Sequence, residues 1–132
     1  MELITSLTNA KVKMALSLQQ KKYRDKYQLF ILEGIRNAEM VIAKNISVQM
    51  CFFTQKAFTN ERGKSILEQL NCPCFEIPEH MYQKISDTQS PQGLMLILPI
   101  QNHNLDDLAT INKSGLYLIL DRLQDPGNIG TI

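Results

Sequence analysis

Short, continuous runs of apolar residues recur along this 132-residue chain, and they constrain its fold more than any other feature. Segments whose apolar residues recur at helical spacing separate these runs. A run that is apolar throughout, rather than at alternate positions, is typical of a strand buried on both faces. The pattern therefore predicts an α/β sandwich around a largely parallel or mixed sheet. The runs before residue 100 are LFILEG (29–34), ISVQMCFFT (46–54), CFEI (74–77) and LMLIL (94–98).

The segments between the runs predict helices. The first helix is expected to begin with Asn9 or Thr8 as its N-cap. The polar stretch YRDKY (23–27) is expected to break it after about residue 22. The other predicted helices cover residues 35–44, residues 60–70 with Asn60 as cap, and a segment whose first turn holds Pro78.

Three sections follow from this pattern. Residues 1–99 contain a complete set of strands and helices and are predicted to form one domain. Residues 100–114 are polar, with room for a short helical turn at 105–111, and are predicted to form a linker. A fresh apolar run at 116–121 is predicted to be a strand, so residues 115–132 are expected to open a second domain.

Composition limits the classes of protein to consider. Hydrophobic residues make up 44% of the chain and charged residues 20%, which is typical of a folded soluble protein. No apolar run approaches the ~20 residues that span a bilayer. The first residues, MELITSLTNAKVK, lack the features of a secretory signal. We therefore expect a cytoplasmic protein with no membrane partner.

Charge is distributed unevenly. Residues 1–30 hold six basic and two acidic side chains, a balance of 6 − 2 = +4, whereas the rest holds 8 basic and 11 acidic ones. A basic segment on a slightly acidic body suggests a localised anion-binding face, although a solvated helix surface would have the same composition.

The cysteines and histidines do not predict a metal site. Cys51 lies in the apolar run MCFF and is most simply a small buried hydrophobe. Cys72 and Cys74 flank Pro73, a spacing too short for the usual C-x-x-C pattern of zinc or redox sites. The two histidines stand far apart in the chain, so we expect no structural metal.

The stretch DRLQDPGNIGTI (121–132) has the composition of a ligand-binding loop. A buried strand that ends in a carboxylate and a glycine-containing turn would place it at the carboxyl edge of a sheet, where open α/β folds bind ligands. It matches neither the phosphate-binding nor the dinucleotide-binding glycine pattern. A plain strand-to-helix turn would use the same residues, so both interpretations stay open.

The same stretch, LDRLQDPGNIGTI, resembles the first signature motif of the SpoU (TrmH-type) family of RNA ribose 2′-O-methyltransferases. Three upstream stretches resemble that family's N-terminal substrate-binding domain: ITSLTNAKVK (4–13), FILEG (30–34) and SDTQSPQG (86–93). The resemblance implies a ribosomal-protein-like α/β/α sandwich that binds RNA. The first strand of a truncated, knotted SPOUT catalytic domain would follow it.

The resemblance also implies an activity. Intact members use S-adenosylmethionine to methylate RNA, more often rRNA than tRNA, and form homodimers through the catalytic domain. Asn128 matches the asparagine of the first motif, while the arginine expected to assist the ribose hydroxyl would follow Ile132. The second and third motifs, which form the cofactor pocket, have no match in this chain. We therefore expect these 132 residues to bind no cofactor and to catalyse nothing.

RNA binding is the function expected to remain. Lysine and arginine would position phosphates, and Tyr23 or Tyr27 could stack on an unpaired base. The alternatives are a stand-alone, non-enzymatic RNA-binding α/β module and, less specifically, a nucleotide-binding or partner-binding α/β domain. The candidate RNA-binding residues are Asn9, Lys11, Lys13, Lys21, Lys22, Arg24, Glu33 and Arg36.

Overall fold

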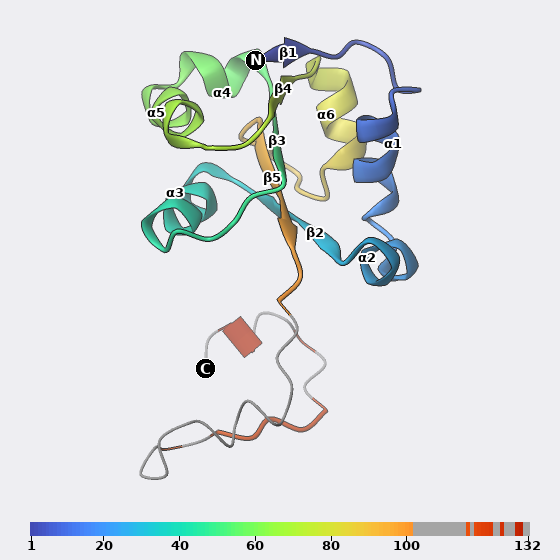
Figure 1. Cartoon of the computed structure of the whole chain (residues 1–132), viewed down its shortest axis with the longest axis vertical. Coiled ribbons are helices and arrows are strands. Elements are labelled where there is room, and N and C mark those ends of the chain that lie inside the picture. The colour runs from blue at the N-terminus through green and yellow to red at the C-terminus, as the bar shows by residue number, and fades with distance from the viewer. Residues whose placement is uncertain (102–115, 117, 123–124, 126–128, 131–132) are drawn as a thin grey trace. The chain divides into compact units, whose positions relative to one another are not determined.

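A computed structural model describes residues 1–101, 116, 118–122, 125 and 129–130. The chain divides into two compact units, residues 1–101 and residues 102–132. The first unit holds all the helices and strands named below (Figure 1). In chain order they are β1 (Glu2–Leu3), α1 (Ala10–Ser17), α2 (Lys21–Tyr27), β2 (Leu29–Glu33), α3 (Ile35–Ala43), β3 (Met50–Phe53), α4 (Gln55–Thr59), α5 (Glu61–Gln69), β4 (Cys74–Glu76), α6 (Glu79–Ile85) and β5 (Leu94–Pro99).

The strands form one mixed sheet in the order β1-β4-β3-β5-β2. β4 pairs in parallel with β1 and β3, whereas β5 is antiparallel to both of its neighbours, β3 and β2. The prediction of a parallel or mixed sheet is thus confirmed in its mixed form. Because β5 alone runs in the opposite direction, its first residues meet the carboxyl ends of β2 and β3.

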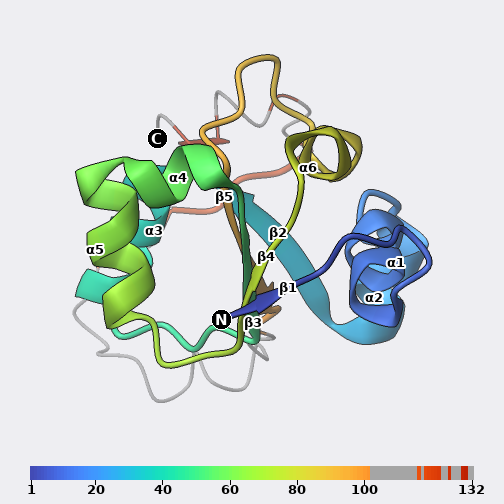
Figure 2. The same ribbon diagram turned by 90° about the horizontal axis from the view of Figure 1, so that it is seen from above.

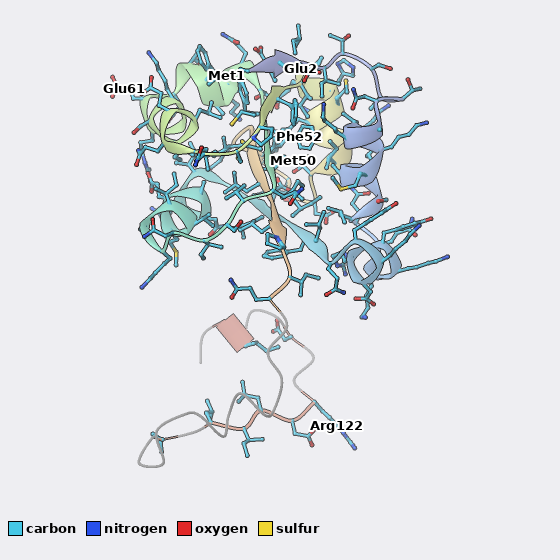
Figure 3. The ribbon with its side chains drawn as sticks, in the orientation of Figure 1. Met1, Glu2, Met50, Phe52, Glu61 and Arg122 are labelled. Atoms are coloured by element: carbon cyan, nitrogen blue, oxygen red, sulfur yellow. The ribbon has the colours of Figure 1, made fainter. Side chains whose placement is uncertain are left out.

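Helices cover both faces of the sheet. Figure 2 shows α3, α4 and α5 on one side of the strands and α1, α2 and α6 on the other. Along β5 the side chains alternate between two core clusters: Met95 and Ile97 pack with α1 and α6, while Leu94, Leu96 and Leu98 pack with α3 and α5. Met50 and Phe52, labelled in Figure 3, belong to the first cluster. The burial on both faces that the apolar runs predict is therefore confirmed for β3 and β5, but not for β2, which lies at the edge of the sheet and is half-buried throughout.

Several predicted boundaries were wrong. The YRDKY stretch does not break a helix but lies within α2, and the interruption comes earlier, at residues 18–20. The Ser17 hydroxyl donates to the Met14 carbonyl at 2.6 Å in the last turn of α1, and Gln28 then ends α2 in a left-handed conformation. A side chain that bonds to its own helix backbone competes with helix continuation, which the charge pattern alone does not reveal.

Other elements differ from the prediction in extent. The strand expected from residue 46 begins only at Met50, and Pro78 is the N-cap of α6 rather than a residue of its first turn. β1 and α4 were not predicted. Residues 116 and 118–121, expected in a strand, are in no strand; Leu116, Leu118, Ile119 and Leu120 are exposed. A strand needs a hydrogen-bonding neighbour, and these residues have none among those described.

The described part of the chain contains no helix with the length and hydrophobicity needed to cross a membrane.

Candidate functional site

The Glu33 carboxylate joins the end of β2 to the segment after α6. Its Oε2 accepts hydrogen bonds from the Ser86 hydroxyl at 2.7 Å and the Thr88 hydroxyl at 3.2 Å. Its Oε1 accepts from the Asp87 backbone N–H at 3.1 Å, and the Tyr82 hydroxyl lies 3.5 Å from Oε2. Glu33 was predicted as an RNA contact. The structure gives its carboxylate internal partners, and a contact with RNA stays a prediction.

Residues 86–93, called the 86–93 loop from here on, are also fixed at their far end. The Gln92 side-chain oxygen accepts from the Ile35 backbone N–H at 2.8 Å, which satisfies a free donor at the start of α3. The Gly93 carbonyl accepts from the Thr54 backbone N–H at 2.9 Å, after β3. The loop therefore lies across the carboxyl ends of β2 and β3, an edge at which α/β folds commonly bind ligands.

The first residues of α1 carry three of the predicted RNA-binding side chains. Asn9 is the N-cap, and its Oδ1 accepts from the Lys11 backbone N–H at 2.9 Å. The Lys11 ammonium lies 4.3 Å from the centre of the Phe75 ring and 3.5 Å from the Glu2 carboxylate. Lys13 is exposed. Asn9 and Lys11 thus have structural roles here, whereas Lys13 points to solvent.

α2 combines aromatic and basic side chains on an unburied helix. None of its residues is buried. The rings of Tyr23 and Tyr27 stack with centroids 6.2 Å apart and an angle of 16° between their planes. The Lys22 ammonium is 5.8 Å from the centre of the Tyr23 ring, and the Lys26 ammonium is 5.3 Å from that of Tyr27. We call these four residues the α2 surface.

Lys26 was missed among the predicted site residues. The sequence does indicate it: Lys26 follows Lys22 by four residues, just as Tyr27 follows Tyr23, and residues four apart lie on the same face of a helix. Predicting a break in the helix at YRDKY removed that signal.

The other two predicted residues of α2 are engaged within the protein. The Lys21 ammonium forms an ion pair with the Asp25 carboxylate at 2.5 Å, one turn along the helix. The Arg24 guanidinium donates to the backbone carbonyls of Leu18 at 2.9 Å and Gln19 at 2.7 Å. Since those carbonyls lie at the end of α1, Arg24 links the two helices. Arg24 therefore has a structural reason to be present.

Arg36 lies apart from these residues in a different group of charges. It is exposed on α3, where Arg62 of α5 donates two hydrogen bonds to the Glu39 carboxylate at 2.8 and 2.7 Å. These hydrogen bonds, together with the positive charges of Arg62 and Arg36, lower the pKa of Glu39. Arg36 already interacts with this carboxylate, so phosphate binding by Arg36 stays a prediction.

All three cysteines of the chain come together at one place. Cys51 of β3 pairs in register with Cys74 of β4, and Cys72 lies two residues before Cys74. Cys51 is fully buried, which confirms its prediction as a small hydrophobe. The Cys51 thiol donates to the Phe52 carbonyl at 3.7 Å, and the Cys74 thiol donates to the Cys72 carbonyl at 3.4 Å. The neighbouring Cys51 and Cys72 side chains lower the pKa of Cys74, against the opposing effect of burial. Within the described residues no group of His, Cys, Asp or Glu side chains has a geometry for holding a metal ion.

Asn128, the predicted catalytic-site residue, lies outside the described residues. Of the described residues near it, Ile129 is exposed, and a Cβ added at Gly130 would meet open space.

Comparison with known proteins identifies relatives for most of this chain. A family described as the MRM3-like substrate binding domain matches residues 9–96. The chain is 31% identical over 117 residues to rRNA methyltransferase 3, mitochondrial, of Xenopus laevis, covering 86% of this chain and 27% of that protein. It is 30% identical over 132 residues to the 23S rRNA (guanosine(2553)-2'-O)-methyltransferase RlmP of Bacillus subtilis (strain 168), covering 100% of this chain and 49% of that protein. The chain thus spans half or less of the length of these two relatives.

Solved structures share the fold. The SpoU methyltransferase AviRb from Streptomyces viridochromogenes, in complex with AdoMet, is similar with a TM-score of 0.77 at 16% identity, covering 93% of this chain and 47% of that chain. An RNA 2'-O ribose methyltransferase is similar with a TM-score of 0.73 at 23% identity, covering 97% of this chain and 48% of that chain.

Proposed function

We propose that this chain, which belongs to the MRM3-like substrate-binding family within the SpoU (TrmH-type) RNA methyltransferases, supplies the RNA-binding part of a ribose 2′-O-methyltransferase. The observation that carries this proposal is the family match over residues 9–96, which contain the whole sheet except β1 and the last three residues of β5. The substrate proposed for the intact enzyme is rRNA, because the curated relatives described above are named as rRNA methyltransferases. As the resemblance to the SpoU family implies, the intact enzyme would form a homodimer through its catalytic domain.

The charge of the protein supports RNA as the partner. The α2 surface presents two ammonium groups beside two aromatic rings, and Lys13 on α1 adds a third exposed ammonium on the same side of the sheet. Lysine side chains bind the phosphate backbone and release condensed counterions, which makes the affinity depend on salt. The proposal therefore has a quantitative test.

The test is RNA binding at increasing salt, measured by fluorescence anisotropy with a labelled rRNA fragment. Replacing both Lys22 and Lys26 by Gln should weaken the slope of log K against log[salt] by about 1.4 to 1.8, since each phosphate contact contributes about 0.7 to 0.9. The matched control replaces Lys44 and Lys64, exposed lysines of the α3–α5 layer, and should leave the slope unchanged. No detectable binding at low salt would overturn the proposal.

Catalysis is proposed for the intact protein only. No chemical step is assigned to the described residues of this chain. In the intact enzyme the cofactor would supply the methyl group.

A stand-alone RNA-binding module is the second candidate, favoured by the two core clusters that described residues between 4 and 98 form. Calorimetry with S-adenosylmethionine separates the two. The 132-residue chain should show no heat of binding, and a chain extended by the downstream coding sequence should bind. An extended chain that carries no second glycine-containing motif and binds no cofactor would favour the module.

A further inference from the structure

We propose that Tyr23 and Tyr27 form a stacking platform for unpaired bases of RNA, with Lys22 and Lys26 holding the phosphates on either side. This inference rests on the proposed RNA-binding function and specifies its ligand: single-stranded rather than duplex RNA. It assigns a role to α2, because packing against the rest of the protein does not explain why this helix carries these residues.

The two tyrosines do not serve the protein core. No residue of α2 is buried, and the Tyr27 side chain is 41% exposed. Their rings stack on each other instead of entering either core cluster, with an interplanar angle of 16°. Two nearly parallel rings one helical turn apart leave aromatic faces available to a further planar group, such as a nucleobase.

The two lysines lie where a stacked nucleotide would need them. Each ammonium is within 6 Å of the centre of a tyrosine ring, at 5.8 Å for Lys22 and 5.3 Å for Lys26. Both lysines are exposed, and their flexible side chains can move from the ring face to a phosphate of the same nucleotide. An exposed cation over a ring is a weak interaction, so a base that stacks on the ring can displace it.

Single-stranded RNA is the favoured ligand because of how bases are stacked. In a duplex each base has both faces covered by its neighbours, so a duplex offers only phosphates to this surface. In a single strand a base can leave its neighbour for an aromatic side chain, which raises affinity by about 5- to 160-fold per base. Duplex RNA would therefore bind through the lysines alone.

Two other basic side chains of α2 contact different groups, away from the tyrosine rings. Lys21 is paired with Asp25, and Arg24 donates to the carbonyls that end α1. Arg24 is not a useful variant, since its removal would disturb the junction between the two helices. Lys21→Gln serves as a charge control on the same helix.

The experiment compares the full chain and its variants for binding to a single-stranded oligouridylate of about 12 nucleotides, within the usual site size, and to an RNA duplex of equal length. Replacing both tyrosines by Leu, which retains helix propensity, should reduce affinity for the single strand at least tenfold and for the duplex less than twofold. Replacing both by Phe keeps the rings and should restore affinity to within twofold of wild type. The salt dependence should be the same in all three proteins, because no charge has changed.

A second measurement needs no variant. The chain has no Trp and four Tyr, so its intrinsic fluorescence reports on tyrosines. Stacking of bases should quench this fluorescence when the single strand binds, and duplex binding should leave most of it. The Lys21→Gln control should quench as wild type does.

The possible results separate this inference from the function on which it rests. If the Leu variant binds the single strand as wild type does, or loses both ligands equally, the platform is wrong while RNA binding stands. Another result is that Lys22→Gln and Lys26→Gln reduce the affinity for duplex and single strand alike, while the tyrosine substitutions change neither affinity. In that case the surface binds only the phosphate backbone, and the platform is wrong. If neither ligand binds at low salt, the proposed function itself fails.

Discussion

Glu33 shows how a single carboxylate can organise the edge of the sheet. Its two oxygens accept from the hydroxyls of Ser86 and Thr88 and from the Asp87 backbone N–H. Hydroxyls can rotate to become acceptors, but a backbone N–H cannot. Glutamine at this position could keep one oxygen on the Asp87 N–H and turn its amide toward the hydroxyls, whereas alanine would lose every contact.

We therefore predict a graded loss of stability. Glu33→Ala should lower the free energy of unfolding by about 1.5 to 3 kcal/mol, the range for hydrogen bonds to a charged group, and Glu33→Gln by about half of that. Urea unfolding followed by circular dichroism measures both. Glu68→Ala, an exposed carboxylate on α5, is the control and should stay within about 0.5 kcal/mol of wild type. A Glu33→Ala protein of wild-type stability that binds RNA poorly would instead indicate a direct contact.

Cys74 should react as a thiolate at a pH at which ordinary cysteines do not. Its pKa is lowered by interaction with the neighbouring Cys51 and Cys72 side chains, whose own pKa values are raised. A group with a lowered pKa keeps its charged form as the pH falls, so alkylation of Cys74 by iodoacetamide should change little between about pH 6 and 8. For an unperturbed thiol, with a pKa of about 8.5, the rate of alkylation would fall nearly tenfold for each pH unit from pH 8 down to pH 6.

Peptide mass spectrometry assigns the label to each cysteine. Cys51 and Cys72 should remain largely unlabelled in wild type. Replacing both by Ala removes these neighbouring thiols and should give Cys74 an ordinary pH dependence. A tenfold rise per pH unit at Cys74 in the wild-type protein would contradict the prediction.

At the scale of elements, the junction between β5 and α4 depends on Gly93. Its φ of +77° is a conformation that residues with a side chain rarely adopt, and a Cβ there would lie 2.3 Å from Thr54 Oγ1. Thr54 is buried, and its hydroxyl has no hydrogen-bond partner among the described residues. The strain at Gly93 and the clash with Thr54 can therefore be separated by mutation.

We predict that Gly93→Ala lowers the free energy of unfolding by at least about 2 kcal/mol, from backbone strain together with the clash. Adding Thr54→Ala should recover part of this loss, because it removes the atom that the new methyl group meets. Thr54→Val has nearly the same shape as threonine and should recover nothing. Thermal or urea unfolding of the double-mutant cycle measures the coupling, and additive effects would show that the clash is unimportant.

The elements that could be predicted from the sequence are those whose signal is local. The apolar runs at β2, β4 and β5 marked strands correctly, although burial on two faces accounts for the run only at β5, since β2 is half-buried throughout and β4 buries only Phe75. β1 has only two residues and exists through its pairing with β4, so it leaves no pattern to recognise. The reversed direction of β5 depends on the path of the chain after α6, which apolar content does not encode.

The residues of the candidate site could likewise be predicted only where their signal is local. Basic residues near the N-terminus and the tyrosines of α2 could be selected from their types and spacing. Their partners could not, because they come from distant parts of the chain: Lys11 lies over Phe75, and Glu33 binds residues more than 50 positions away. The thiol cluster was missed for the same reason, since Cys51 and Cys74 become neighbours only when β3 pairs with β4.

At the scale of the whole molecule, the described residues that form the two core clusters lie between residues 4 and 98. The described residues of the second unit that carry large apolar side chains, such as Leu116 and Ile119, are exposed. Burial of apolar area is the main stabilising contribution to folding, so the first unit should hold nearly all the stability of the chain.

We therefore predict that a chain ending at Gln101 folds on its own. Its melting temperature should lie within about 2 °C of that of the 132-residue chain, since a loss of 1 kcal/mol would shift a domain of this size by about 4 to 8 °C. Amide NMR spectra should superimpose for residues 1–95. Because the α2 surface is complete in both chains, affinity for single-stranded RNA should also agree within twofold. A fall in melting temperature of 8 °C or more would mean that residues 102–132 contribute to the core, and a loss of RNA binding alone would place part of the binding site in them.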